Sequence, residues 1–416
     1  MSLAFSKLKQ LDWPLFVLMV LMVCFGLILQ SGLSLSVTRP GLSSFERQLI
    51  FVLLGLFLFF LISLSDYRLI RSLSYPFYVL VLFLLLAVLF FGTPQRGVKG
   101  WFSLGTFNFQ PIELAKLSVI ILLARFWQTV RRPLKFRHLF LSFMLILPLL
   151  VLTIFQPDIG SAIVVFIIGL GLSLMADRNK KHILILFIIL IIIFSSSWFF
   201  LKDYQKDRFL NYFNPSQDPF GRGYQLNQAI IAVGSGGFFG RGFGLGTQSY
   251  LKFLPGAETD FTFAVLAEEF GFMGCCLFLG FYLFFLLRLI KISKKIYDNF
   301  ALVLVLGVAL YFFSQMFINV GMNLGLLPII GLPLPFLSYG GSSLLVSMIA
   351  VALVESVIIH QPPHQISKLS MHKMRYIGNT HKFPKSGKIR EYDQPNFVSQ
   401  TYGLRTIPGI SQKVAD

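Results

Sequence analysis

The stretch that decides the fold joins a long polar segment to a long apolar one: Phe253-Leu254-Pro255-Gly256-Ala257-Glu258-Thr259-Asp260-Phe261. From residue 262 to residue 285 the chain is mostly apolar, and about 20 such residues are enough to cross a bilayer. The preceding residues, 203–259, are polar and glycine-rich, and they are too numerous for a simple turn. We therefore expect Glu258 and Asp260 to lie where a large external loop meets the membrane.

The composition places the whole chain among integral membrane proteins. Hydrophobic residues make up 55% of it and charged residues 13%. A ruler of about 20 apolar residues predicts ten spans, at residues 13–32, 49–65, 75–92, 111–126, 139–156, 160–176, 182–201, 261–287, 299–322 and 335–359. Helices satisfy their own backbone hydrogen bonds in lipid. We therefore predict an all-α, polytopic membrane bundle with a large external loop, residues 202–260, between the seventh and eighth spans.

The distribution of lysine and arginine predicts the orientation. Basic residues favour the cytoplasmic side, and most of them fall in the loops that are internal if the N-terminus is internal. Ten spans return the C-terminus to the same side, so we expect both termini in the cytoplasm. This topology accounts for most of the net charge of +18, so we expect no nucleic-acid binding. The basic tail is a candidate to contact anionic membrane lipids, although a solvated, disordered tail is the favoured interpretation.

Two domains are expected from the same pattern. Residues 1–359 form the ten-span membrane domain. Residues 360–416 are a polar cytoplasmic tail without a periodic apolar face, and we expect this tail to be disordered. The three cysteines, Cys24, Cys275 and Cys276, lie within predicted spans and show neither a disulfide framework nor zinc-ligand spacing.

Charged residues inside predicted spans are expensive and are usually functional. Glu113 and Lys116 are three residues apart and share one helix face, so we expect them to pair. Two interpretations remain open. The pair either makes a polar helix tolerable in the membrane, or lines a cavity and orients a substrate or a catalytic acid.

Other acidic residues favour structural roles. Asp158 lies in the turn Gln156-Pro157-Asp158-Ile159-Gly160, where capping of the sixth span is the favoured interpretation. One of Glu268 and Glu269 must face the protein interior, where we expect a structural hydrogen bond. Glu355 is expected to be a solvated residue at the end of the last span.

The large loop and the last span each contain a run of small residues. Residues 223–234 predict an amphipathic helix with Leu226, Ala229, Ile230 and Val233 on its apolar face. A glycine-rich run follows at 234–246, and Arg241 within it and Lys252 after it are candidates to contact a diphosphate. The segment from Ser338 to Ser343 opens the tenth span, where close helix packing is the favoured interpretation.

The chain resembles the SEDS family (shape, elongation, division and sporulation) of bacterial cell-wall polymerases. The matching motifs follow one another at family-like spacing over nearly the whole membrane region. They are Lys99-Gly100-Trp101, Gln110-Pro111 with Glu113 and Lys116, residues 156–160, Asp218-Pro219, Gly223-Tyr224-Gln225, Gly234-Ser235-Gly236-Gly237, Thr259-Asp260-Phe261, Ala267-Glu268-Glu269, Asn319 with Gly321, and residues 335–343. Residues 246–249 and 325–335 are more similar to the RodA-type elongation members than to the FtsW-type division members.

The resemblance implies polymerisation of lipid II into glycan strands at the outer face of the bacterial cytoplasmic membrane, for cell elongation and shape. It also implies a partner, a class B penicillin-binding protein that crosslinks the strands. The transmembrane helix of this partner would pack near the hairpin of the eighth and ninth spans, which contains the aromatic residues Phe278, Phe281, Tyr282, Phe284 and Phe285. The key acid of the family corresponds to Asp260. This residue either takes a proton from the attacking sugar hydroxyl or holds a divalent cation, Mg or Mn. An N-cap role for Asp260 is compatible with both.

One motif departs from the family pattern. Members usually carry Glu after the proline of the 253–261 loop and often carry His before the Thr, whereas this chain has Gly256 and Glu258. The role of that Glu in binding metal or substrate is therefore open here.

Other functions compete with the elongation polymerase. The alternatives are a lipid II flippase, an FtsW-like septal polymerase and a non-catalytic scaffold. The polar residues cluster at the outer ends of the spans, which favours an outer-face enzyme over a flippase.

Overall fold

The computed structural model describes residues 7–34, 42–95, 97–105, 107–130, 134–176, 181–182, 184–185 and 222–361. Most of the predicted seventh span, at 182–201, lies outside the described residues. So do the first part of the large loop, 202–221, and the tail from residue 362 onward. All the described residues belong to one compact unit, Met1–Pro362.

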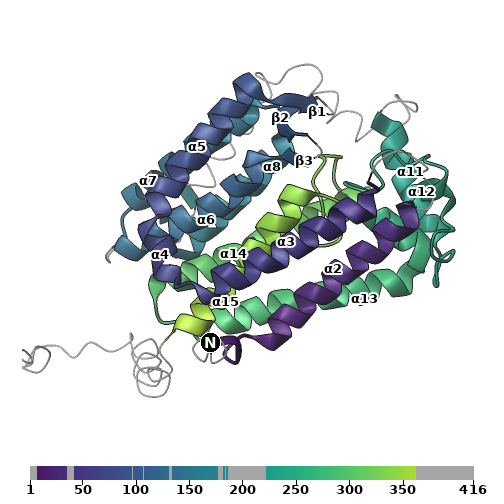
Figure 1. Ribbon diagram of the computed structural model, residues 1–416. Helices are drawn as coiled ribbons and strands as arrows, with labels where there is room; N and C mark the ends of the chain where they lie inside the picture. The colour runs from purple at the N-terminus through teal and green to yellow at the C-terminus, as the bar shows by residue number, and fades with distance from the viewer. Residues whose placement is uncertain are drawn as a thin grey trace, which may run out of the picture. The chain divides into compact units, whose positions relative to one another are not determined.

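Eight helices in the described part of the chain are long and apolar enough to cross a membrane (Figure 1). They are α2 (Trp13–Ser34), α3 (Ser44–Leu64), α5 (Ser74–Phe91), α7 (Phe136–Phe155), α8 (Ile159–Ala176), α13 (Thr262–Ser293), α14 (Asn299–Asn323) and α15 (Gly341–His360). A short helix, α4 (Tyr67–Ser72), connects α3 to α5. The all-α, polytopic membrane fold is confirmed, and the count of ten spans stays a prediction.

The fourth predicted span forms a helix of a different character. Helix α6 (Pro111–Thr129) starts with proline at its first turn, where the missing amide hydrogen costs nothing. It contains Glu113, Lys116 and Arg125, and most of its residues are buried. It contacts α5, α8, α14 and α15, so its polar residues face other helices.

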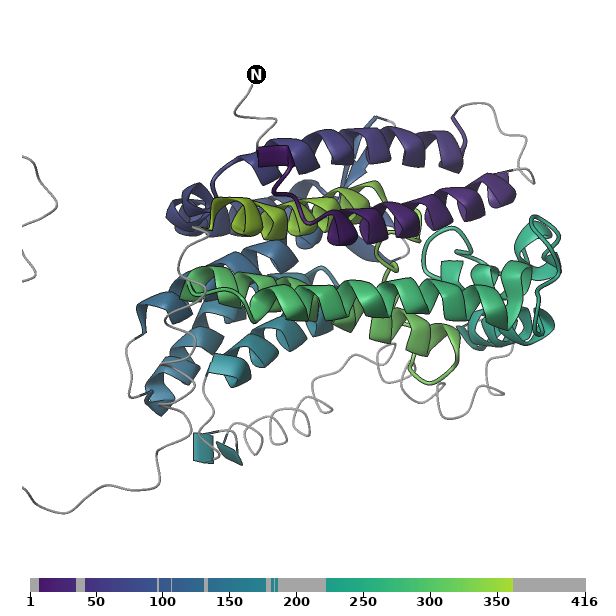
Figure 2. The same ribbon diagram turned by 90° about the horizontal axis from the view of Figure 1, so that it is seen from below.

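Helix α15 is the most buried of the eight apolar helices. It packs along α3 and also contacts α14 and α6, and Figure 2 shows it between α3 and α14. It is apolar on all sides, as expected for a helix that other helices surround. Its first residue is Gly341, so the predicted start at residue 335 was too early. The prolines Pro333 and Pro335 keep the preceding segment out of the helix.

A small sheet forms where we expected only an external loop. Strands β1 (Thr93–Gln95), β2 (Val98–Leu104) and β3 (Phe107–Phe109) are antiparallel in the order β1-β2-β3. The sheet connects α5 to α6 and lies at the end of these helices (Figure 1). Its strands are too short to be recognised in the sequence by an alternation of polar and apolar residues.

Helix α13 is broken at Gly271, whose φ of 66° and ψ of −164° suit only glycine. The break frees backbone groups, which the glycine-rich run of the large loop satisfies. Four hydrogen bonds do so: Arg241 N to Glu268 O (2.9 Å), Gly242 N to Glu269 O (3.0 Å), Phe272 N to Gly237 O (2.9 Å) and Met273 N to Phe238 O (3.1 Å). The glycine-rich run is therefore docked on α13.

The neighbouring parts of the large loop also pack on α13. Helix α11 (Arg222–Ser235) confirms the predicted helix, with Leu226 and Ala229 buried, but Ile230 is exposed and Ala232 is buried in its place. The Glu268 carboxylate accepts hydrogen bonds from Gln248 N (2.8 Å) and Ser249 N (3.1 Å) in α12 (Thr247–Tyr250). The predicted structural hydrogen bond is thus made by Glu268.

The start of α2 meets the ends of α13 and α15 at what we call the His360 end of the bundle. Asp12 accepts two hydrogen bonds from Arg288, at 2.9 and 2.7 Å, and Asp12 N donates to Glu355 (2.9 Å). Glu355 is 0% exposed, so our expectation of a solvated residue was wrong. Asp12, just before α2, contacts this carboxylate, and α3 and α4 pack on α15.

Candidate functional site

A pocket of about 560 Å³ lies at the opposite end of the bundle from the His360 end. It is formed by the starts of α3, α6, α13 and α15, the sheet, and the turn between α7 and α8. Asp260, Glu113, Asp158 and Arg47 line it together with polar and aromatic residues that include Trp101, Asn108, Gln110, Gln225, Thr259, Tyr339, Ser342 and Ser343. Segments far apart in the sequence therefore contribute to one site.

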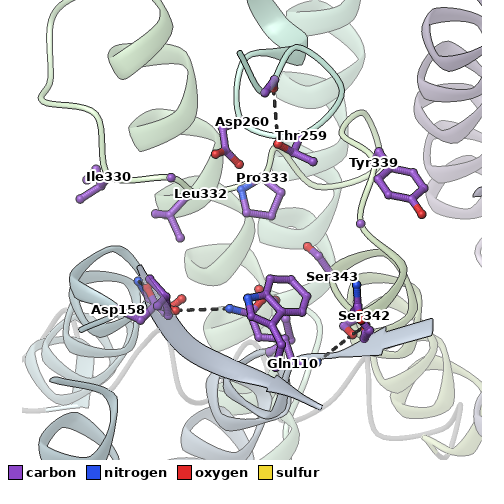
Figure 3. A pocket seen from close by; sticks show the side chains of 18 of the residues that line it. Gln110, Asp158, Thr259, Asp260, Ile330, Leu332, Pro333, Tyr339, Ser342 and Ser343 are labelled. Carbon is purple, nitrogen blue, oxygen red and sulfur yellow. Dashed lines mark hydrogen bonds between the residues drawn. The ribbon is translucent and has the colours of Figure 1, made fainter. Parts of the chain in front are cut away.

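Asp260 is held in place through its main chain. Its N–H donates to Gly256 O (3.1 Å), and its carbonyl oxygen accepts from Asn319 Nδ2 (3.0 Å) and Asn323 Nδ2 (3.1 Å). The half-buried side chain points into the pocket (Figure 3). The cap of α13 is Phe261 rather than Asp260, so the N-cap interpretation was wrong. Our sequence analysis named Asn319 only as part of a family motif and did not predict that Asn319 and Asn323 contact Asp260.

Asp158 faces the pocket from the side opposite Asp260 (Figure 3). Its Oδ1 accepts from Ser161 N at 2.9 Å in the first turn of α8, which confirms the predicted cap. Its Oδ2 accepts from Gln110 Nε2 at 3.4 Å. One carboxylate therefore caps a helix with one oxygen and presents a polar edge to the pocket with the other.

Glu113 and Lys116 form the predicted ion pair. Lys116 Nζ lies 2.7 Å from Glu113 Oε1, and the side chains are 0% and 1% exposed. Glu113 also lines the pocket, and its Oε2 is buried without a hydrogen-bond partner. The salt bridge of the first interpretation is confirmed, and Glu113 lines a cavity as the second interpretation requires. A role of the pair in orienting a substrate or a catalytic acid stays a prediction.

The cation at the pocket is one that our sequence analysis did not single out. Arg47 is the only lysine or arginine among the described residues that line it. Arg241 instead donates to Ser235 O (3.2 Å) and Thr247 Oγ1 (3.3 Å), and Lys252 is exposed. Neither of these two lines the pocket. The only sequence signal for Arg47 is its position one residue after the capping box Ser43–Glu46 at the start of α3.

Tyr339 and the serines at the start of α15 complete this side of the pocket. Burial raises the pKa of Tyr339, so its hydroxyl stays protonated and can donate at neutral pH. Ser342 Oγ accepts from Gln110 N (3.1 Å) and donates to Asn108 O (3.2 Å). The packing interpretation of residues 338–343 was therefore incomplete, because these residues also border the cavity.

Glu258 and Gly256, the two residues that depart from the family pattern, both have structural roles in this protein. Glu258 Oε2 accepts from Ser44 Oγ (2.6 Å), and its carbonyl accepts from Gln30 Nε2 (3.0 Å) and Tyr339 N (2.8 Å). Glu258 does not line the pocket and instead ties the loop to α2 and α3. Gly256 has a φ of 82°, which favours glycine in this turn.

The residues at the pocket do not fit a cation held by protein side chains alone. No group of three His, Cys, Asp or Glu side chains with metal-binding geometry occurs in the described part of the chain. Magnesium is commonly held by one or two carboxylates together with water and substrate phosphates, so the role of Asp260 as a cation ligand stays a prediction.

Comparisons with known proteins agree on one group of relatives. The FtsW/RodA/SpoVE family model, described as a cell cycle protein, matches residues 12–362. Peptidoglycan glycosyltransferase MrdB of Escherichia coli K12 is 34% identical over 344 residues, which cover 82% of this chain and 93% of MrdB. A protein of Thiomicrospira cyclica named "Probable peptidoglycan glycosyltransferase FtsW" is 35% identical over 360 residues, which cover 83% of this chain and 91% of the relative.

Solved structures show the same architecture. A chain from a study of the structural coordination of polymerization and crosslinking by a peptidoglycan synthase complex matches with a TM-score of 0.73 and 32% identity, over 85% of this chain and 99% of that chain. The crystal structure of the rod shape determining protein RodA of Thermus thermophilus matches with a TM-score of 0.62 and 29% identity, over 85% and 98% of the two chains.

Proposed function

The chain belongs to the FtsW/RodA/SpoVE family, and we propose that it polymerises lipid II into glycan strands at the Asp260 pocket. It is a peptidoglycan glycosyltransferase of the multi-pass membrane type, and its similarity to MrdB and RodA supports a role in cell elongation and shape. The observation that carries the proposed chemistry is that one pocket presents both the Asp260 carboxylate and the Arg47 guanidinium.

Glycan extension requires an acid-base group and a cation in this arrangement. The 4-hydroxyl of one sugar attacks the anomeric carbon of the next and forms a C–O bond, while the bond between that carbon and the lipid diphosphate breaks. A base must accept the hydroxyl proton, and positive charge must meet the leaving diphosphate. Asp260 is the carboxylate that points into the pocket from the loop before α13, and we assign it the first role.

Arg47 is suited to the second role. It borders the pocket beside Tyr339 and the start of α15. Helix α15 has no side-chain cap at its N-terminus, and the N-terminal end of a helix favours anions. Arg47, the hydroxyl of Tyr339 and the N-terminal end of α15 together provide an environment for a diphosphate. The buried pair of Glu113 and Lys116 supports the wall of the same cavity.

Replacing Arg47 with Gln is therefore expected to lower the rate of lipid II polymerisation by roughly 10²-fold, since a positioned donor to developing negative charge contributes that much. Glutamine keeps a hydrogen-bond donor and removes the charge. The rate would be measured on the purified protein with its partner. Arg241→Gln is the matched control, because it removes a cation of the large loop that does not line the pocket. A large loss for Arg241→Gln with none for Arg47→Gln would move the diphosphate to the glycine-rich run.

The proposed orientation places the pocket at the outer surface and both termini in the cytoplasm. The distribution of basic residues supports it, because those near the His360 end include Lys7, Arg71, Arg288 and Lys291. Lipid II would then present its sugars to the pocket at the outer leaflet while its chain stays in the bilayer. We keep residues 1–359 as the catalytic membrane domain and 360–416 as a cytoplasmic tail in this proposal.

The proposed partner is a class B penicillin-binding protein, and its transmembrane helix would pack on α13. Not every ring of the aromatic stretch suggested above is available to it. Phe285 is 0% exposed and packs on Phe312 and Phe336, so it cannot contact a second protein. Phe281 is half-buried and packs on Phe25 of α2.

Phe284 is 62% exposed, and Leu277, two turns earlier on the same face, is also exposed. We expect the double change Leu277→Ala with Phe284→Ala to lower recovery of the partner in co-purification by about tenfold, because a packed aromatic and a leucine contribute at least 1.4 kcal/mol. The control pair is Phe57→Ala with Leu61→Ala, which lies on the exposed face of α3. Equal recovery from both double variants would exclude this face of α13.

A further inference from the structure

The segment that brings Tyr339 to the pocket is not helical, so its main chain has to be held by other groups. The part before Tyr339 is a turn closed on itself. Ser338 N donates to Leu334 O (3.0 Å), and Leu334 N donates to Ser338 Oγ (2.9 Å). Helix α15 begins only at residue 341. Tyr339 and Gly340 therefore lie between two ordered elements and depend on contacts from distant segments.

Gln48 of α3 supplies such contacts on both sides of Tyr339. Its side chain is buried, at 1% exposure. Gln48 Nε2 donates to Ser338 O (3.3 Å), and Gln48 Oε1 accepts from Gly340 N (3.3 Å). Main-chain groups away from water require hydrogen-bond partners, and one amide side chain satisfies two of them here. The residues immediately before and after Tyr339 are thereby tied to α3.

The same contact fixes the start of α15 and the loop that carries the catalytic acid. The carbonyl of Gly340 accepts the first main-chain hydrogen bond of α15, at 2.8 Å. Tyr339 N donates to the carbonyl of Glu258 (2.8 Å), two residues before Asp260. The position of Tyr339 is thus coupled to both the N-terminal end of α15 and the Asp260 loop.

Arg47 precedes Gln48 in α3, and the two side chains have different surroundings. Consecutive residues of a helix do not face the same side, and only Arg47 lines the pocket. Burial raises the pKa of Tyr339, and the charge of Arg47 and a hydrogen bond with it oppose this rise, so the two groups are neighbours. Arg47 Nε is buried and has no hydrogen-bond partner in the described part of the chain. A donor therefore remains for a ligand.

We propose that Gln48 is a positioning residue: by holding the peptide groups on both sides of Tyr339, it keeps the Tyr339 hydroxyl beside Arg47, so that both meet the leaving diphosphate. This rests on the proposed function and adds to it a residue that does not itself line the pocket. Donors that are already in place stabilise developing charge without reorganisation. A misplacement of about 1 Å can lower a rate by roughly 10²-fold.

The test is a double-mutant cycle on the purified protein with its partner. Gln48→Met keeps the length of the side chain and removes both hydrogen bonds, and Tyr339→Phe removes the hydroxyl. Each single change is expected to lower the rate of lipid II polymerisation roughly tenfold. Each should also raise the concentration of added undecaprenyl diphosphate that halves the rate by about the same factor. Because Gln48 acts through the Tyr339 hydroxyl, the double variant should be no slower than Tyr339→Phe alone.

The control is Gln315→Met, which removes a buried amide from α14 away from the pocket and should leave rate and inhibition unchanged. Losses that multiply in the double variant overturn the proposal, because Gln48 then acts independently of Tyr339. Unchanged rate and inhibition in Gln48→Met also overturn it. If Gln48→Met does not fold, Gln48→Asn makes the same comparison, since its amide is one methylene too short to reach both peptide groups. Absence of polymerisation by the wild type would instead remove the proposed function.

Discussion

Replacing Asp260 with Asn is expected to reduce lipid II polymerisation by roughly 10²- to 10⁴-fold, the contribution of a positioned general base. Asparagine has nearly the same shape as aspartate but cannot accept the proton of the attacking hydroxyl. The rate would be followed as the appearance of glycan strands from lipid II by the purified protein with its partner. The same variant should remain folded and partner-bound.

The fold is expected to survive this change because the main chain of Asp260 is hydrogen-bonded to Gly256, Asn319 and Asn323. These hydrogen bonds do not depend on the charge of the side chain. Glu258→Gln is the matched control, because it removes an acid two residues away that does not line the pocket. We expect that variant to polymerise at a rate close to the wild type. Substantial polymerisation by Asp260→Asn would remove Asp260 from the mechanism.

Replacing Lys116 alone with Met is expected to destabilise the protein by about 3–5 kcal/mol, because it leaves the buried Glu113 carboxylate without its counter-ion. The double change Glu113→Gln with Lys116→Met removes both charges and should cost much less. Both variants carry the same methionine, so the difference between them isolates the unpaired charge. Thermal unfolding in detergent, followed together with polymerisation, would measure it.

Two outcomes of this comparison would distinguish the roles of the pair. If the single and double variants unfold alike, the 2.7 Å contact between Lys116 and Glu113 contributes no net electrostatic stability. If the double variant is stable but inactive, the pair supports the chemistry as well as the fold. The free Glu113 Oε2 at the pocket makes this second outcome the one that we expect.

The sequence predicts the membrane helices well, because an apolar run of about 20 residues has few other uses in a protein. The predicted spans at 13–32 and 299–322 match α2 (Trp13–Ser34) and α14 (Asn299–Asn323) to within two residues. The small sheet was missed for a physical reason. Its strands have three to seven residues. Thr93 pairs with Trp101 and Pro94 with Lys99, so Gly100 forms a bulge that breaks the alternation of side chains along β2.

The candidate site was only partly predictable. Asp260, Glu113 and Asp158 stand out because a charge beside an apolar run is costly and therefore conspicuous. Arg47 looks like any basic residue at the end of a span, and only the packing of α3 beside α15 brings it to the pocket. Glu355 is buried for a similar reason, since Asp12, far away in the sequence, donates a hydrogen bond to its carboxylate. Contacts between distant segments decide these cases, and a local pattern does not encode them.

The central claim is that this chain polymerises lipid II itself, at the pocket that Asp260 and Arg47 both line. The most direct test uses the purified wild-type protein together with its penicillin-binding partner, in which the transpeptidase serine is replaced by alanine. Both proteins would be incubated with lipid II in detergent. The products would then be separated by length. We predict long, uncrosslinked glycan strands from the wild type and none when the chain carries Asp260→Asn. Intact lipid II in the wild-type reaction, together with transfer of lipid II across a bilayer by the same protein in liposomes, would contradict the claim and identify a transporter.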